Sequence, residues 1–165
     1  IVTEPTAIVL SLVSTEVNCN GGNDGAVDLT VSGGTGPYTY AWDNGAITED
    51  LSNISAGIYW VTATDANNCT ATICDTITEP AQPLEVTAVL DNDISCYNAD
   101  DAQITATATG GTPSYTFSPD GIQFFPVNVV SGLPAGTYIV IAKDANDCLD
   151  TIPQPIIVTN PPQIL

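Results

Sequence analysis

Residues 33–40 have the sequence Gly-Gly-Thr-Gly-Pro-Tyr-Thr-Tyr, and residues 110–117 have the sequence Gly-Gly-Thr-Pro-Ser-Tyr-Thr-Phe. In both stretches a glycine pair and a proline predict a turn, and the alternating run after it predicts a half-buried strand. The second stretch begins 77 residues after the first (33 to 110). Because a turn and its strand recur together, the chain contains a duplicated unit.

Other strings repeat in the same order. Val17-Asn18-Cys19 matches Ile94-Ser95-Cys96, and Asp65-Ala66-Asn67-Asn68-Cys69 matches Asp144-Ala145-Asn146-Asp147-Cys148. The offset grows from 77 to 79 residues (69 to 148), so the second copy carries an insertion, which we place within residues 118–131. We expect two domains, 1–79 and 80–165. Pro80 and Pro83 limit the freedom of the short connector and predict a restricted joint.

The composition predicts strands. Thr, Val and Ile are abundant, β-branched side chains fit a pleated surface, and no long helical periodicity is present. Seven or so short strands per unit predict an all-β chain of two tandem immunoglobulin-like β-sandwich domains. The strands expected in the first copy are 8–17, 26–31, 38–42, 46–48, 51–54, 58–64 and 70–77; in the second copy they are 84–94, 102–109, 114–118, 123–130, 137–142 and 149–158.

The charge excludes several functions. The chain has 19 acidic residues, one basic residue (Lys143) and no histidine, for a formal net charge of −18. Nucleic-acid binding and docking on anionic lipid both need Lys and Arg, so neither is expected. No apolar run approaches the roughly 20 residues of a membrane span, so no direct membrane insertion is expected. A Ser, Thr or Cys nucleophile would lack a base, so we expect a non-catalytic protein.

A family resemblance rests on four strings. Residues 19–25 (Cys-Asn-Gly-Gly-Asn-Asp-Gly), 32–42, 56–59 and 64–70 resemble the SprB repeat. That repeat occurs in very large cell-surface adhesins of Bacteroidetes, including the gliding-motility adhesin. The resemblance implies an extracellular, cell-surface location and export by the type IX secretion system. The Trp turn at 42–45 is also similar to the PKD domain, whereas copy two has Ser118-Pro119-Asp120-Gly121 there.

Four of the five cysteines form two duplicated pairs. Cys19 corresponds to Cys96 and Cys69 to Cys148, while Cys74 has no counterpart. One duplicated pair per unit in an exported chain predicts the disulfides Cys19–Cys69 and Cys96–Cys148, with buried free thiols as the alternative. The first strand of a standard sandwich runs parallel to the last, so these bonds require a first strand that kinks, switches sheets or runs antiparallel to the last. For Cys74 we expect a buried free thiol, or a bridge to a neighbouring molecule.

Such disulfides would bring two acidic loops of each unit together. Clustered Asp and Asn oxygens suit Ca²⁺, and the candidate ligands are Asp24, Asp65 and Asn67 in copy one and Asp101, Asp144 and Asn146 in copy two. The alternative is that these residues form ordinary Asx-turns.

Two further site predictions concern glycans and aromatic side chains. The strings Asp75-Thr76-Ile77 and Asp150-Thr151-Ile152 fit the pattern on which Bacteroidetes attach O-glycans, so the resemblance implies glycosylation of Thr76 and Thr151. Trp42 is expected in the core, and either Trp60 or its neighbour Tyr59 faces outward.

These observations favour a structural role. We expect a stalk segment of an extracellular adhesin or filament, with neighbouring repeats of the same chain as partners, that spaces an adhesive tip from the cell. The alternatives are a module that binds glycan or surface polysaccharide, and an accessory domain of a surface enzyme.

Overall fold

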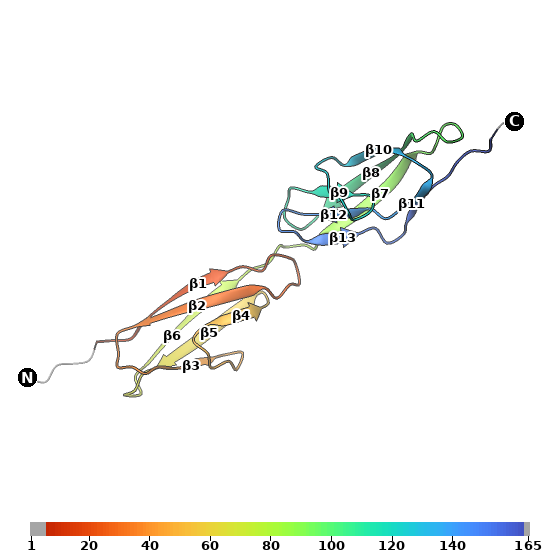
Figure 1. Cartoon of the computed structure of the whole chain (residues 1–165). Helices are drawn as coiled ribbons and strands as arrows, with labels where there is room; N and C mark the ends of the chain where they lie inside the picture. Colours follow the sequence, from red (N-terminus) through yellow and green to blue (C-terminus); the bar gives the residue numbers. More distant parts are fainter. Residues whose placement is uncertain (1–5, 164–165) are drawn as a thin grey trace, which may run out of the picture. The chain divides into compact units, whose positions relative to one another are not determined.

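The computed structural model describes residues 6–163, and the regular structure in this range consists of β-strands alone. The chain divides into two compact units, residues 1–79 (unit 1) and 80–165 (unit 2) (Figure 1). Within the described range, no helix is long and apolar enough to cross a membrane. Each unit is an all-β sandwich, as the repeat pattern predicts, and is described by itself below.

Unit 1 is formed by two three-stranded antiparallel sheets, β1-β2-β4 and β3-β5-β6 (Figure 1). Its strands are β1 (Val9–Thr15), β2 (Gly25–Ser32), β3 (Thr39–Trp42), β4 (Leu51–Ile54), β5 (Gly57–Thr64) and β6 (Thr70–Ile77). The residues 46–48, expected to form a strand, form none. They follow the turn at Asn44-Gly45, and Thr48 instead accepts a hydrogen bond from the Trp42 side chain (Nε1 to O, 2.9 Å).

The alternation in each strand decides which side chains enter the core of unit 1. In β2, Val27 and Leu29 are buried whereas Asp28 between them is exposed. Trp42 is 4% exposed and packs in the same core, which confirms its predicted position. Trp42 of β3 lies directly opposite the buried Val61 of β5 in the same sheet, and both pack in one cluster with Val27 and Leu29 of the facing sheet, so the two sheets enclose one apolar layer.

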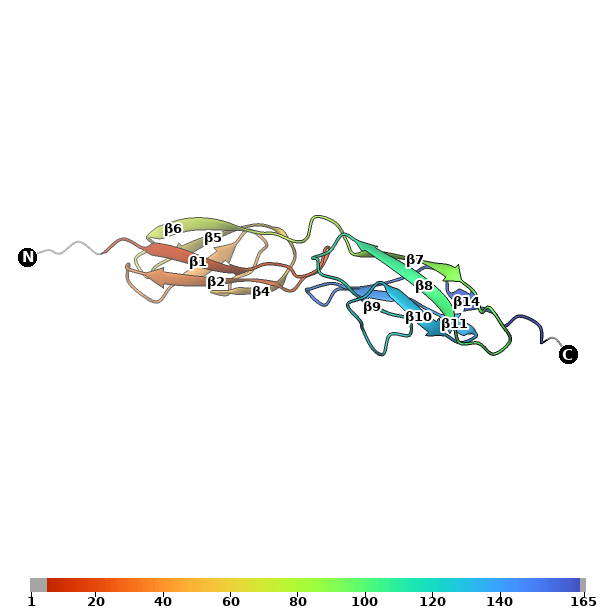
Figure 2. The ribbon, with the colours of Figure 1, turned by 90° about the horizontal axis from the view of Figure 1, so that it is seen from above.

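Unit 2 repeats this architecture with interrupted strands. Its strands are β7 (Glu85–Asn92), β8 (Ala102–Thr109), β9 (Thr116–Ser118), β10 (Val129–Leu133), β11 (Gly136–Tyr138), β12 (Ile141–Lys143), β13 (Leu149–Thr151) and β14 (Ile156–Val158). They form the sheets β10-β8-β7 and β13-β12-β9 and the pair β11-β14, seen from two sides in Figures 1 and 2.

Three of the strand predictions for unit 2 are wrong in detail. The strand expected at 137–142 is interrupted at residues 139–140, between β11 and β12. The strand expected at 123–130 begins only at Val129, because Pro126 lacks an amide to donate and Phe125 makes a single bridge to Phe117. The strand expected at 149–158 is split into β13 and β14. Pro153 and Pro155 lie between the two parts and interrupt the ladder in the same way.

The first and last strands of each unit run side by side in the same direction. In unit 1 the Val17 amide donates to the Thr78 carbonyl (3.0 Å), and Ser14 in β1 donates to Asp75 in β6. Both links join residues 61 positions apart, which is the signature of a parallel pair. In unit 2 the links are Val86 to Asp150 (2.7 Å) and Thr159 to Asp93 (2.9 Å), so β7 is parallel to β13 and β14.

Every unit therefore has two opposite ends. The term leading end is used for the end at which the chain enters a unit. It comprises residues 6–8, 33–35 and 65–69 in unit 1 and 81–84, 110–112 and 144–148 in unit 2. The end where the chain leaves is the trailing end; it comprises residues 17–25 and 78–79 in unit 1 and 94–101 and 158–163 in unit 2.

Candidate functional sites at the two ends of each unit

A buried aspartate organises the leading end of unit 1. Asp65 is 5% exposed, and its carboxylate accepts hydrogen bonds from three backbone amides. The donors are Thr35 (3.0 Å), Asn67 (2.9 Å) and Cys69 (2.8 Å). The side-chain amide of Asn67 then donates to Thr35 Oγ1 (3.0 Å). One side chain thus ties the β2–β3 turn to the β5–β6 turn.

Unit 2 has the same arrangement around Asp144. This carboxylate accepts from the amides of Thr112 (2.8 Å), Asn146 (2.9 Å) and Cys148 (2.9 Å), and Asn146 donates to Thr112 Oγ1 (3.1 Å). The repeated string Asp-Ala-Asn-x-Cys is therefore a loop framework in both units. This is the Asx-turn alternative to the calcium hypothesis.

The hydrogen bonds also hold Asp65 in its charged form. Donation from the Cys69 amide, with those of Thr35 and Asn67, lowers the pKa of the Asp65 carboxyl below its usual value of 3.8, against the opposing effect of desolvation. A carboxylate saturated by amide donors directs its oxygens into the protein. It therefore has little capacity left to coordinate a cation.

A glycine at each leading end allows two segments to approach closely. Gly33 and Gly110 have positive φ angles (73° and 69°), and a Cβ at either position would lie 1.9 or 1.8 Å from the carbonyl oxygen of Ala7 or Pro83. The carbonyl of Gly110 accepts from the Tyr115 hydroxyl (2.7 Å), and Tyr38 donates to Gly33 in the same way. This explains why the strings at 33–40 and 110–117 both contain two glycines and a tyrosine that follows the first glycine by five residues.

The trailing ends are held by other acidic residues. In unit 1 Asp24 accepts from the backbone and side chain of Asn18 (3.1 and 2.5 Å), and Glu79 accepts from the Gly21 amide (2.6 Å). In unit 2 Asp101 accepts from the Ser95 amide (3.0 Å) and from its hydroxyl. The Ser95 hydroxyl lowers the pKa of Asp101 below its usual value.

The predicted disulfide pairs are wrong. Cys69 and Cys96 are free thiols, so neither of the predicted bonds is present. The reason is the parallel course of the first and last strands, which puts Cys19 at the trailing end and Cys69 at the leading end. β6 separates these ends with eight residues, or about 26 Å of strand, whereas a disulfide needs Cα atoms within about 7 Å.

The calcium hypothesis fails for the same reason. Asp24 lies at the trailing end of unit 1, while Asp65 and Asn67 lie at its leading end; Asp101 is likewise remote from Asp144 and Asn146 in unit 2. Among residues 6–163, no three His, Cys, Asp or Glu side chains are grouped so that they could hold a metal ion.

Cys74 is exposed, which contradicts the expectation of a buried thiol. It lies on the outer face of β6, directly opposite Trp60 on β5. Trp60 is 51% exposed, so it is the outward residue of the Tyr59–Trp60 pair. Its counterpart in unit 2 is Ile139, and the exposed aromatic therefore does not recur.

The two threonines predicted as glycosylation sites have exposed side chains, Thr76 on β6 and Thr151 on β13. Their accessibility is compatible with modification, and glycosylation stays a prediction. The sites differ in their neighbours: the amide of Thr76 donates to Asp75 Oδ1 (2.8 Å), whereas Asp150 accepts from Val86 of β7.

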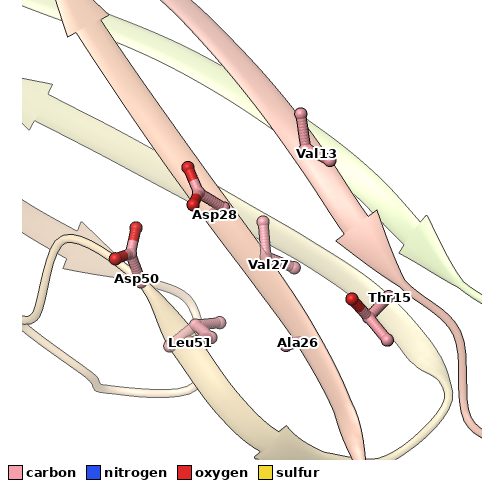
Figure 3. Close-up of a pocket in the computed structure, with 7 residues that line it drawn as sticks. All are labelled: Val13, Thr15, Ala26, Val27, Asp28, Asp50 and Leu51. Atoms are coloured by element: carbon pink, nitrogen blue, oxygen red, sulfur yellow. The ribbon is translucent and has the colours of Figure 1, made fainter.

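The described part of the chain has several surface hollows. Figure 3 shows one of about 360 Å³ across β1, β2 and β4, between Val13 and the carboxylates of Asp28 and Asp50. Asp50 is already engaged, because it accepts from the Leu29 amide (2.9 Å). This hollow combines two like charges with apolar side chains, and no Lys or Arg is among the residues that line it.

Two tandem immunoglobulin-like β-sandwich modules, each with the same hydrogen-bonded ends, define the class of this protein. The sequence model of the SprB repeat matches residues 11–47 and 92–123, one stretch in each unit. Each unit thus contains a stretch that matches the SprB repeat, a repeat of cell-surface proteins, and the predicted resemblance is confirmed.

Comparison with solved structures returns further β modules. The three N-terminal domains of the bacteriophage RB49 highly immunogenic outer capsid protein (Hoc) match with a TM-score of 0.48 and 18% identity, over 92% of this chain and 59% of that one. The fibronectin(III)-like modules of Clostridium thermocellum CbhA match with a TM-score of 0.37 and 16% identity, over 92% of this chain and 95% of theirs. No curated protein sequence matches the chain.

Proposed function

We propose that this chain is a spacer segment in the stalk of an extracellular adhesin or filament, and that each repeat transmits tension along its length. The proposal rests above all on the parallel first and last strands of each unit. The chain enters at one end of the sandwich and leaves at the other, so a pull on the two termini of a unit slides these strands past each other.

Such a geometry resists force because the links between the strands are stretched together, not one after another. In unit 1 the links are Val17 to Thr78, Thr78 to Glu16 and Ser14 to Asp75. Separating the strands therefore requires several hydrogen bonds to break at once.

Unit 2 meets the same requirement with different residues. Asp93, just after β7, accepts from both the amide and the hydroxyl of Thr159 (2.9 and 2.7 Å), and Asp150 on β13 accepts from the Val86 amide. Different side chains make equivalent links in the two copies. What the two units share is therefore the connection between their first and last strands, not the residues that make it.

Single-molecule stretching of the chain from its two termini, with all of its cysteines reduced, tests the proposal. A double variant, Ser14→Ala with Asp75→Ala, removes the side-chain link between β1 and β6 and is expected to lower the unfolding force of unit 1 while that of unit 2 stays the same. The matched control is Thr62→Ala with Thr72→Ala, which removes a hydroxyl pair (3.0 Å) between β5 and β6.

The control pair joins two strands that are consecutive in the chain, so a pull on the termini does not slide them directly past each other. Equal losses of force in both double variants would contradict the proposed force path. Unit 1 opening at forces no greater than those needed to extend an unfolded chain would contradict the spacer role itself.

A second candidate function is supported by the loop 119–128 of unit 2. This loop exposes Ile122 (84%), Phe125 and Val127, three apolar side chains near one another in sequence. Exposed apolar groups on a loop are typical of recognition surfaces. The surface of a polysaccharide is one target that such a loop would fit.

Co-sedimentation with insoluble polysaccharides separates the two functions. Binding by the unmodified chain that is lost in Ile122→Ser with Val127→Ser would favour recognition by this loop. Both positions are largely exposed, so the variant is expected to keep its fold.

A further inference from the structure

The outer face of the sheet β3-β5-β6 in unit 1 consists mostly of threonine. Successive side chains of a strand point to opposite faces of the sheet, so every second residue of these strands lies on the face away from the core. The name threonine face is used for this set. Its members are Thr39 and Ala41 of β3, Ile58, Trp60, Thr62 and Thr64 of β5, and Thr70, Thr72, Cys74 and Thr76 of β6.

Two large apolar side chains lie at one end of the threonine face. Trp60 is 51% exposed and Ile58, two residues before it on β5, is 59% exposed. The residue opposite Trp60 on β6 is Cys74, whose side chain is too short to cover an indole ring. The core of unit 1 is closed by Trp42 and Val61 without this ring, so the exposed face of Trp60 is free for a ligand.

A row of hydroxyl groups continues from Trp60 along the two strands. Thr62 lies directly opposite Thr72, and their hydroxyl oxygens are 3.0 Å apart. Thr64 lies opposite Thr70 in the next exposed pair. Each hydroxyl both donates and accepts hydrogen bonds, so this row suits a ligand that is itself rich in hydroxyl groups.

The threonine face carries no charge, although the chain as a whole has 19 acidic residues and one basic residue. Asp75 of β6 points to the other side of the sheet, where it accepts a hydrogen bond from Ser14 of β1. Asp43 lies at the margin, since its amide donates to the Trp60 carbonyl (3.0 Å). An anionic ligand would be repelled by the chain, and a cationic one would find no counter-charge on the face, so a neutral ligand fits best.

The size of the face argues against a protein partner. β5 and β6 have eight residues each, so three strands cover roughly 14 by 27 Å, or about 380 Å². A stable protein interface buries about 800 Å² on each partner. A second copy of this chain would also add a further net charge of −18. A narrow, extended and neutral ligand is therefore favoured over a protein surface.

We propose that the threonine face binds a neutral polysaccharide, with one pyranose ring stacked on Trp60. The C–H groups of a pyranose face carry slight positive charge and meet the negative face of the indole ring. The hydroxyl groups of the following sugars then bond to Thr62 and Thr72. An equatorially linked chain is flat and extended, and it can therefore lie along the strands. The site belongs to unit 1 and depends neither on the stalk role nor on the loop 119–128.

Titration calorimetry of the full chain with three neutral β-1,4-linked oligosaccharides, cellohexaose, xylohexaose and mannohexaose, tests the proposal. At least one should bind and should protect Trp60 from quenching by acrylamide. Trp60→Ala should weaken this binding at least about tenfold, whereas Trp60→Phe should keep part of it. The matched control is Val13→Ala, which removes another exposed apolar side chain of unit 1 from its other sheet and should leave the affinity unchanged.

Two further comparisons test the hydroxyl row and the absence of charge. Thr62→Val with Thr72→Val keeps the shape of both side chains and should weaken binding several-fold. The acidic hexamer of galacturonic acid should bind at least about tenfold more weakly than the neutral ligand at low salt. Failure of all three neutral oligosaccharides to bind, or binding that Trp60→Ala leaves intact, would overturn the proposal. Dimerisation of the chain that is lost in Trp60→Ala would overturn it in favour of a second copy.

Discussion

Asp65 is the residue on which the leading end of unit 1 depends. Three backbone amides donate to its carboxylate, so Asp65→Asn replaces a charged acceptor by an amide that leaves part of these donors unpaired. We expect faster hydrogen exchange at Thr35, Asn67 and Cys69 and a melting temperature of unit 1 lowered by several degrees. Unit 2 serves as the internal control, and Asp144→Asn should reverse the pattern.

The same carboxylate predicts a pH dependence. Its folded-state pKa is lowered, so its contribution to stability is fully present above the unfolded-state value of 3.8 and is lost as the pH falls through the folded-state pKa. The stability difference between the unmodified chain and Asp65→Asn should therefore be largest near neutral pH and shrink below about pH 4. A difference that grows on acidification would contradict this assignment.

Gly33 and Gly45 have similar backbone conformations but differ in the space that a Cβ would find. Both have positive φ angles (73° and 88°), but a Cβ at Gly33 would strike the Ala7 carbonyl at 1.9 Å, whereas nothing lies within 4 Å of one at Gly45. Gly45→Ala should cost only the conformational term of about 1–2 kcal/mol.

Gly33→Ala should cost this term and at least a further 1–3 kcal/mol, because the backbone of Ala7 must move. Denaturant unfolding followed by hydrogen exchange in unit 1 measures both values. Similar losses in the two variants would show that the approach of residues 6–8 to this turn is not needed for stability. Gly110→Ala should repeat the larger effect in unit 2, where the obstacle is the Pro83 carbonyl (1.8 Å).

At the scale of a strand, the period of two assigns the two tryptophans opposite roles. Trp42 on β3 is buried in the core of unit 1, and Trp60 on the neighbouring β5 faces out. We expect Trp42→Ala to cost about 3–5 kcal/mol and Trp60→Ala less than about 1 kcal/mol.

Fluorescence separates the two positions independently of stability. Acrylamide should quench Trp60 strongly in a Trp42→Phe variant, and it should quench Trp42 weakly in a Trp60→Phe variant. Strong quenching of both would place Trp42 outside the core and contradict the register of β3 against β5.

Local patterns predicted the strands and the core better than the sites. Alternation in β2 and β5 and the repeated glycine turn were sufficient for the sandwich and its duplication. The predicted disulfides failed because duplication shows which cysteines are equivalent but not which end of a sandwich each occupies. The end that a cysteine occupies depends on the direction of the neighbouring strand. Because the first strand of a standard sandwich runs parallel to the last, the two cysteines of a unit could have been predicted to lie at opposite ends.

The role of Asp65 and Asp144 could also have been predicted from the sequence. The string Asp-Ala-Asn-x-Cys occurs at the same turn in both units, and a turn residue that recurs with its neighbours favours a framework over a ligand site. The insertion in unit 2 was less predictable. Whether residues 123–128 continue a strand depends on pairing with β8, which only the packed sheet determines.

At the scale of the whole molecule, the net charge of −18 is the dominant electrostatic feature, and the last prediction concerns how cations act on it. Like charges repel in the compact state, and salt screens them over a Debye length of about 10 Å at 0.1 M. The melting temperature should therefore rise by a few degrees between low salt and roughly physiological ionic strength.

Calcium should act through this screening alone. The proposed ligands Asp24 and Asp65 lie at opposite ends of unit 1, and Asp65 is already saturated by amide donors. Ca²⁺ and Mg²⁺ at equal concentration should therefore raise the melting temperature equally, and Asp24→Asn should not change the response. A specific site would give a larger shift with Ca²⁺ that grows with the logarithm of its concentration, because binding to the folded state alone stabilises it by mass action. Thermal unfolding in EGTA, in Mg²⁺ and in Ca²⁺ at matched ionic strength distinguishes the two, and a shift confined to Ca²⁺ would require a site built from oxygens other than those of Asp24 and Asp65.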